Sequence, residues 1–196
     1  MKVLVDNSHG EETPGKRSPD GRFREYAYTR RLASVIVAGL RSLGHDAELL
    51  VPETHDVSLP ERVRRVNTIC QKVGAQNVIL VSVHVNAAGN GEWKTARGWS
   101  CYTSKGQTKS DTIAECLYTA AERYLAGHRI RTEKVDGDRD IEQGFYILRK
   151  TLCPAVLVEN FFMDNRDDLA FLESSAGQAA IITTHIEGID TYIKGL

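Results

Sequence analysis

The sequence predicts an α/β fold, with a mostly parallel twisted sheet of about six strands flanked by helices. Short apolar runs rich in β-branched residues, at 3–5, 78–83 and 154–158, lack clean polar alternation and are typical of buried parallel strands. Longer segments with helical periodicity alternate with them, which favours strand–helix–strand units. No repeat, low-complexity stretch or linker divides the 196 residues, so we expect a single domain over 1–196.

The first part of the chain predicts a strand, a long loop, a helix and a second strand. The strand at 3–6 leads into a loop rich in Gly and Pro at 10–21. A helix is expected over 24–43, where apolar residues recur at helical spacing and Gly44 suits the position after the helix end. The second strand is expected at 47–51.

A capping signal marks the next helix. Ser58 and Glu61 have capping-box spacing, Pro60 suits the first turn, and Gly74 ends the apolar stripe. We expect the arginines of this helix to form a solvated face; they are Arg62, Arg64 and Arg65. Strands are expected to follow at 77–83 and 98–103.

The last part of the chain predicts three further helices and the final strand. A charged, turn-rich segment at 132–144 is expected to be a surface loop. The expected elements, in chain order, are a helix at 110–126, a short strand at 145–148, a strand at 154–160, and helices at 166–173 and 177–194.

Polar residues stand where three of the apolar runs end. His9 follows the first strand, His84 ends the run at 78–83, and Glu159 ends the run at 154–158. Functional groups gather at the carboxyl ends of strands in open α/β sheets. This placement indicates a metal or acid–base site, although three unrelated strand-end residues would give the same pattern.

The residue types suit a zinc hydrolase. A catalytic zinc ion takes three protein ligands of N, O or S type and keeps a fourth position open. His9 and His84 can supply two ligands, and Glu25 is well placed as the third if the loop at 10–24 folds back. Glu159 is then the candidate general base. No H-E-x-x-H motif is present, so spacing alone does not identify the chemistry.

Four motifs in order carry a family resemblance. They are Asp6–Gly10, Glu25 at a helix start, Ser82–Ala87, and Pro154–Glu159. With these motifs the chain resembles the zinc-dependent N-acetylmuramoyl-L-alanine amidases of the amidase-3 type, over nearly its whole length. It departs from that family at Asn7-Ser8, where Pro-Gly is common, and at Phe161, where Gly is frequent after the catalytic glutamate. These departures change the rim of the site and leave its ligands in place.

The resemblance implies specific roles. His9, Glu25 and His84 would bind Zn²⁺, and Glu159 would be catalytic. The implied reaction is hydrolysis of the amide between N-acetylmuramic acid and L-alanine of the peptidoglycan stem peptide, as in endolysins and autolysins. Two alternatives stay open: a zinc peptidase or amidase for another small amide, and an inactive binder of wall fragments. Retention of Glu159 argues against the binder.

Net charge and hydropathy restrict the possible partners. With a net charge of −1 the chain has no overall positive potential that would attract nucleic acid, and no apolar run is long enough to cross a membrane. We expect peptidoglycan or muropeptide as partner, no nucleic acid, no membrane insertion and no separate cell-wall-binding domain. The N-terminus lacks a signal-peptide pattern. We expect cytoplasmic synthesis with action at the wall after release or lysis, or export through a leader removed beforehand.

One segment bears on access to the site. The charged segment at 132–144, with Asp136, Asp138, Asp140 and Glu142, has too little apolar periodicity for a helix that could cover a metal. We therefore expect an uncovered site. The sequence does not indicate an oligomeric state or a preferred wall chemotype.

Overall fold

Six strands form one mixed sheet in the computed structural model, which describes residues 1–133 and 137–196. The sheet order is β2-β1-β3-β6-β4-β5. Strands β2, β1, β3 and β6 are parallel, β4 runs antiparallel to β6, and β5 is parallel to β4. The prediction of a mostly parallel sheet is confirmed. The bounds are β1 (Lys2–Asp6), β2 (Asp46–Leu49), β3 (Val78–Asn86), β4 (Ser100–Thr103), β5 (Ile141–Glu142) and β6 (Ala155–Phe162).

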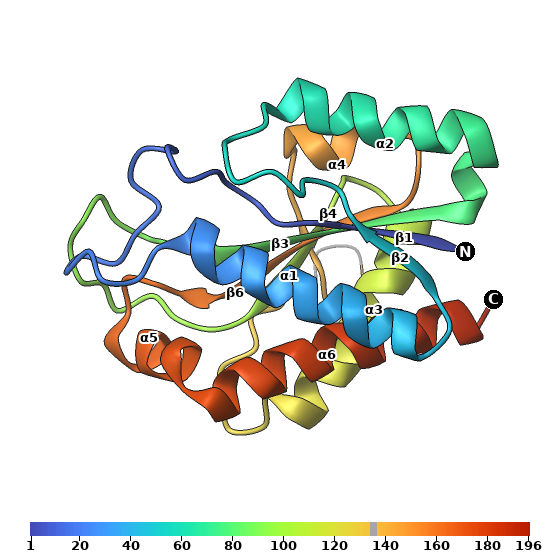
Figure 1. The fold of residues 1–196 in the computed structure, drawn as a ribbon. Helices are drawn as coiled ribbons and strands as arrows, with labels where there is room; N and C mark the ends of the chain where they lie inside the picture. The colour runs from blue at the N-terminus through green and yellow to red at the C-terminus, as the bar shows by residue number, and fades with distance from the viewer. Residues whose placement is uncertain (134–136) are drawn as a thin grey trace.

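Helices cover both faces of the sheet (Figure 1). Helices α2 and α4 lie over one face, and α1, α3, α5 and α6 lie over the other. Both chain termini lie at one end of the molecule, opposite the long loops. The helix bounds are α1 (Glu25–Ser42), α2 (Leu59–Val73), α3 (Lys109–Tyr124), α4 (Tyr146–Lys150), α5 (Arg166–Glu173) and α6 (Ser175–Lys194), with a 3₁₀ turn at Ala75–Asn77.

Alternate strand residues feed two separate cores. Val5, Val81 and Val158 pack under the layer that contains α1, α3 and α6. Leu4, Leu80 and Leu157 pack under α2 and α4. Because both faces are buried, the parallel strands read as continuous apolar runs, as the sequence suggested.

Strand register carries the polar residues onto one face. Asp6 pairs with Ser82, and His84 pairs with Glu159. Since side chains alternate along a strand, these four residues continue the face that carries Leu4, Leu80 and Leu157. They therefore lie at the carboxyl edge of the sheet, on the side of α2 and α4.

Two local predictions are wrong. The expected strand at 145–148 is instead the start of α4, because a four-residue apolar run cannot distinguish a strand from a buried helical turn. Within the expected loop at 132–144, Ile141–Glu142 forms β5 against β4. By contrast, the predicted cap of α2 is present, with Ser58 Oγ accepting from Glu61 N at 3.4 Å. In the described part of the chain no helix is long and apolar enough to cross a bilayer.

Candidate metal centre

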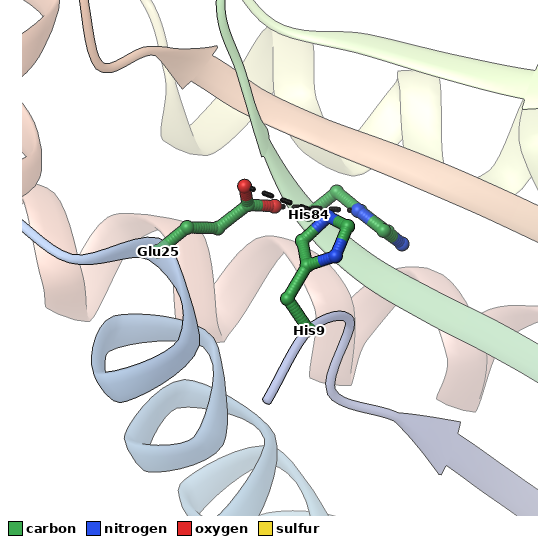
Figure 2. Close-up of side chains that lie close together, drawn as sticks. All are labelled: His9, Glu25 and His84. Atoms are coloured by element: carbon green, nitrogen blue, oxygen red, sulfur yellow. Dashed lines mark ion pairs between the residues drawn. The ribbon is translucent and has the colours of Figure 1, made fainter. Parts of the chain in front are cut away.

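Three predicted ligands meet at the carboxyl edge of the sheet (Figure 2). His9 comes from the loop after β1, Glu25 is the first residue of α1, and His84 lies near the end of β3. One ligand atom from each lies within 4.8 Å of the others. Glu25 Oε2 is 3.7 Å from His9 Nε2, and Glu25 Oε1 is 3.3 Å from His84 Nδ1.

The donor set fits a zinc ion. His9 Nε2 and Glu25 Oε2 are buried and have no hydrogen-bond partner among the described residues. Buried polar atoms without a partner are costly, so two of them next to each other suit a cation that both would bind. Two imidazole nitrogens and one carboxylate oxygen match catalytic zinc sites that leave a fourth position open.

The loop before α1 folds back to deliver Glu25. Glu25 N donates to Lys16 O at 2.9 Å, and Glu25 Oε1 accepts from Val85 N at 3.1 Å. One turn further along α1, the Thr29 hydroxyl lies 2.9 Å from the Ser8 hydroxyl, which joins the helix to the loop that carries His9. The carboxylate thus reaches past the sheet edge from the α1 layer, while its Oε1 is already oriented by a backbone amide.

Electrostatics prepare the ligands differently. Burial lowers the pKa of His9 to about 4, so this imidazole is neutral at pH 7. Burial alone would raise the pKa of Glu25, but the hydrogen bond with His84 and the charge of that histidine outweigh it and lower the pKa. Burial opposes protonation of His84, but Glu25 and the nearby carboxylates raise its pKa on balance. At a pH below this raised pKa, metal binding would release a proton from His84.

Glu159 stands beside this cluster as predicted. It pairs with His84 across β3 and β6. Together with His9 and His84 it lines a cavity of about 390 Å³. Its Oε2 is buried, and no residue in the described part of the chain hydrogen-bonds to it. Burial raises the pKa of Glu159 to about 7, against the lowering effect of His84 and Lys16. A carboxylate with a pKa near the working pH can take and return a proton.

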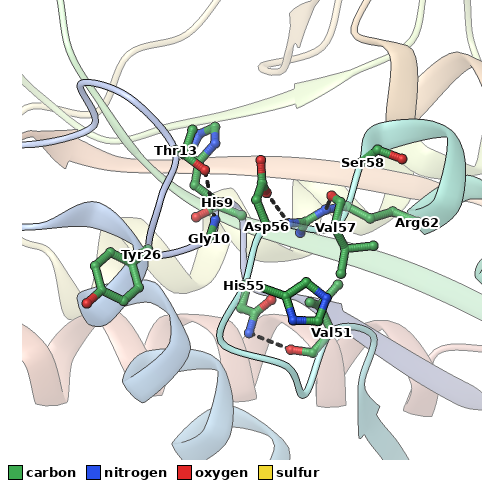
Figure 3. Close-up of polar contacts among 12 residues, drawn as sticks. His9, Gly10, Thr13, Tyr26, Val51, His55, Asp56, Val57, Ser58 and Arg62 are labelled. Atoms are coloured by element: carbon green, nitrogen blue, oxygen red, sulfur yellow. Dashed lines mark hydrogen bonds and ion pairs between the residues drawn. The ribbon is translucent and has the colours of Figure 1, made fainter.

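Arg62 corrects the expected solvated face of α2. Its side chain is 2% exposed, and Nη1 lies 2.5 Å from Asp6 Oδ1. Nε donates to Val57 O at 2.7 Å, and Nη2 lies 3.2 Å from Asp56 Oδ1 (Figure 3). Arg62 is four residues before the buried Val66, so its place on the apolar stripe was a signal for burial that the arginine cluster obscured.

Two loops form one rim of the cavity. Glu11 N donates to Thr54 O at 3.1 Å, and Asp56 N donates to Glu12 Oε1 at 2.8 Å. In Figure 3 the loop that carries Gly10 and Thr13 runs beside the loop that carries His55 and Asp56. Arg62 of α2 also contacts the second loop at Val57 and Asp56, so this rim is fixed to the helix.

Part of the cavity lining is apolar. Leu59, Phe145 and Tyr146 line the cavity and remain 49%, 37% and 37% exposed. Among the described residues of 132–144, none lines the cavity or joins the metal cluster, and the uncovered site stays a prediction. Asp136 of that segment lies outside the described residues.

The fold and the site together fit an α/β metallohydrolase, with three candidate ligands and a buried carboxylate gathered at the carboxyl edge of the sheet. The family model described as N-acetylmuramoyl-L-alanine amidase (Amidase_3) matches residues 3–191. The chain belongs to this family of zinc amidases. The resemblance noted from the four motifs is thereby confirmed.

Similar proteins span phages and bacteria. The chain is 33% identical over 192 residues to an endolysin of Bacillus phage SPP1, covering 95% of this chain and 64% of that protein. It is 28% identical to the N-acetylmuramoyl-L-alanine amidase CwlM of Bacillus licheniformis, covering 96% of this chain and 67% of that protein. The chain thus spans about two thirds of the length of these curated relatives. The solved structure of N-acetylmuramoyl-L-alanine amidase AmiC2 of Nostoc punctiforme matches with a TM-score of 0.81 and 25% identity, over 99% of this chain and 97% of that one.

Proposed function

We propose that this protein is a zinc-dependent amidase that cleaves the bond between the lactyl group of N-acetylmuramic acid and L-alanine in peptidoglycan. The observation that carries the proposal is the convergence of His9, Glu25 and His84 beside Glu159 in a chain of this family. The endolysin name of the phage relative supports action at the cell wall.

The side chains divide into ligands and a base. His9, Glu25 and His84 hold the metal, which when bound supplies Lewis-acid polarisation of the amide carbonyl and acidifies the attacking water. Glu159 accepts a proton from that water and delivers it to the departing nitrogen of L-alanine. Its raised pKa suits both transfers, because a stronger base than an exposed carboxylate holds the proton between the two steps.

The cavity offers both charged and apolar surface to the substrate. Lys16 lines the cavity, and its charge acts on His9 and Glu159. Among the described residues it makes no ion pair, so we assign it to a carboxylate of the stem peptide. The rings of Phe145 and Tyr146 offer surface for a sugar ring. This polarity supports a substrate that joins a glycan to an acidic peptide.

Digestion of purified peptidoglycan tests the proposal. Metal-loaded protein is expected to release intact stem peptides that begin with free L-alanine, leaving uncut glycan chains, as measured by mass spectrometry. Glu159→Gln should keep one zinc per chain and lose about 10²-fold or more in rate. Glu92→Gln removes an exposed carboxylate that pairs with Lys94 and should change neither quantity.

The alternative outcomes are distinct. Cleavage within the stem peptide would instead identify a zinc peptidase. Absence of any released peptide from walls of several chemotypes, with zinc bound, would reject hydrolysis and leave a binding role.

A further inference from the structure

A buried row of three polar side chains ends on the ligand His84. Arg62, Asp6 and Ser82 are 2%, 1% and 0% exposed. Arg62 Nη1 lies 2.5 Å from Asp6 Oδ1, and Ser82 Oγ lies 2.6 Å from Asp6 Oδ2. Ser82 Oγ is in turn 3.1 Å from His84 Nε2. None of the three has a part in the proton transfers assigned to Glu159.

The fold gives this row a fixed geometry. Asp6 and Ser82 face each other in adjacent parallel strands, and Ser82 and His84 are two residues apart on one strand face. Arg62 reaches down from α2, whose packing covers that face. Strand register therefore aligns the acceptor, the hydroxyl and the imidazole without any contribution from a loop.

The proton positions along the row follow from the inventory of donors. A carboxylate paired with a guanidinium only accepts, so the single hydroxyl proton of Ser82 is donated to Asp6. Ser82 Oγ can then only accept from His84, which requires a proton on Nε2. The lone pair of neutral His84 is thereby left on Nδ1, the nitrogen that lies 3.3 Å from Glu25 Oε1.

We infer that Arg62, Asp6 and Ser82 are positioning residues that hold His84 in the tautomer able to bind the metal through Nδ1. The inference rests on the proposed zinc site. Partners behind a ligating histidine fix its tautomer and ring orientation, and their loss typically weakens metal binding 10- to 100-fold.

The isosteric change Asp6→Asn reverses the direction of the hydrogen bonds from residue 6 to His84. Arg62 can only donate, so the amide oxygen of Asn stays on Arg62 and its NH₂ group faces Ser82. Ser82 then accepts from Asn and turns its own proton to His84 Nε2. Neutral His84 must now carry its proton on Nδ1, where the metal would bind.

Zinc affinity is measured by competition with a chelator. It distinguishes the effect of reversed hydrogen bonds from a nonspecific disturbance of the buried site. Asp6→Asn should weaken zinc binding about 10- to 100-fold. Ser82→Ala frees His84 to adopt either tautomer and should weaken binding by less than Asp6→Asn. Asp168→Asn is the matched control: Asp168 is 1% exposed and accepts from Gly98 N and Phe162 N, away from His84, so affinity should be unchanged.

A second measurement needs no variant and no metal. In ¹⁵N NMR spectra of the metal-free protein, recorded at a pH high enough that the spectra themselves show a single ring proton on His84, that proton should be on Nε2. A proton on Nδ1 in the native chain would overturn the inference, as would wild-type zinc affinity in folded Asp6→Asn or a greater loss in Ser82→Ala. Correct tautomer and affinities in a protein that releases no stem peptide would instead reject the proposed function alone.

Discussion

Gly10 and Asp56 approach so closely that a β-carbon on Gly10 would lie 2.1 Å from the backbone nitrogen of Asp56. Real β-carbons do not come that near to backbone atoms, so only glycine permits this contact between the two rim loops. The loop that follows His9 and the loop that precedes α2 are therefore packed backbone against backbone. The first loop directly follows the candidate ligand His9, and the second accepts a hydrogen bond from Arg62.

Gly10→Ala should separate these loops. We expect a loss of about 1–3 kcal/mol in the free energy of unfolding, because backbone must move to admit the methyl group, together with reduced peptidoglycan hydrolysis. Gly144→Ala is the control, since a β-carbon there would meet only the Arg149 side chain at 3.9 Å. Urea unfolding and turnover of both variants check this prediction. Wild-type values for Gly10→Ala would show that the rim is not constrained by the contact.

Phe161 should tolerate glycine better than alanine. Its φ is 65°, in the left-handed region, at a point where β6 has one residue more than β3 between the pairs His84–Glu159 and Asn86–Phe162. Both substitutions remove a fully buried ring that contacts Phe171, at a cost of about 3–5 kcal/mol. Glycine alone relieves the backbone strain, so Phe161→Gly should unfold with about 1 kcal/mol more free energy than Phe161→Ala. The reverse order in urea denaturation, as usual for strands, would contradict this.

The convergence of the candidate site residues was predictable in part, because groups that follow the ends of parallel strands meet at one sheet edge. His9, His84 and Glu159 were identifiable in this way, whereas Glu25 depended on a helix start and on the family motif. Arg62 was missed because a charged residue among arginines resembles solvated surface; its burial depends on a tertiary partner, Asp6, distant in sequence. The left-handed φ of Phe161 could not be read from its identity, although the frequent glycine at that motif position was a hint.

Acidity should make the metal-free protein more stable through Glu159. Its pKa is about 7 in the folded chain and has the ordinary value of about 4.5 when unfolded. Between these values the unfolded chain loses the proton first, so this stabilisation is complete below about pH 4.5 and is lost as the pH rises towards 7. Relative to Glu159→Gln, wild type should lose on the order of 2–3 kcal/mol between pH 5 and 8. Chemical denaturation of both proteins across this range, with chelator present, provides the measurement. Parallel pH profiles would contradict the prediction.

Zinc should stabilise the fold through its three ligands only. At a free concentration 100 times the dissociation constant, a ligand that binds only the folded chain adds about 2.7 kcal/mol to the free energy of unfolding. Thermal unfolding with and without chelator should show this shift in wild type and in Glu159→Gln. His9→Ala removes a ligand and should greatly reduce the shift. An equal loss of the shift in Glu159→Gln would make Glu159 a ligand rather than a base.

Glu25 approaches the cavity from the α1 layer, whereas His84 and Glu159 point from the sheet face that packs against α2 and α4. A bound ion would therefore act as a cross-link between these two layers. Opening of the long loop before α1 would require a ligand bond to break, which should slow limited proteolysis within residues 10–24 when zinc is present. Protease resistance and catalytic competence would then be gained and lost together.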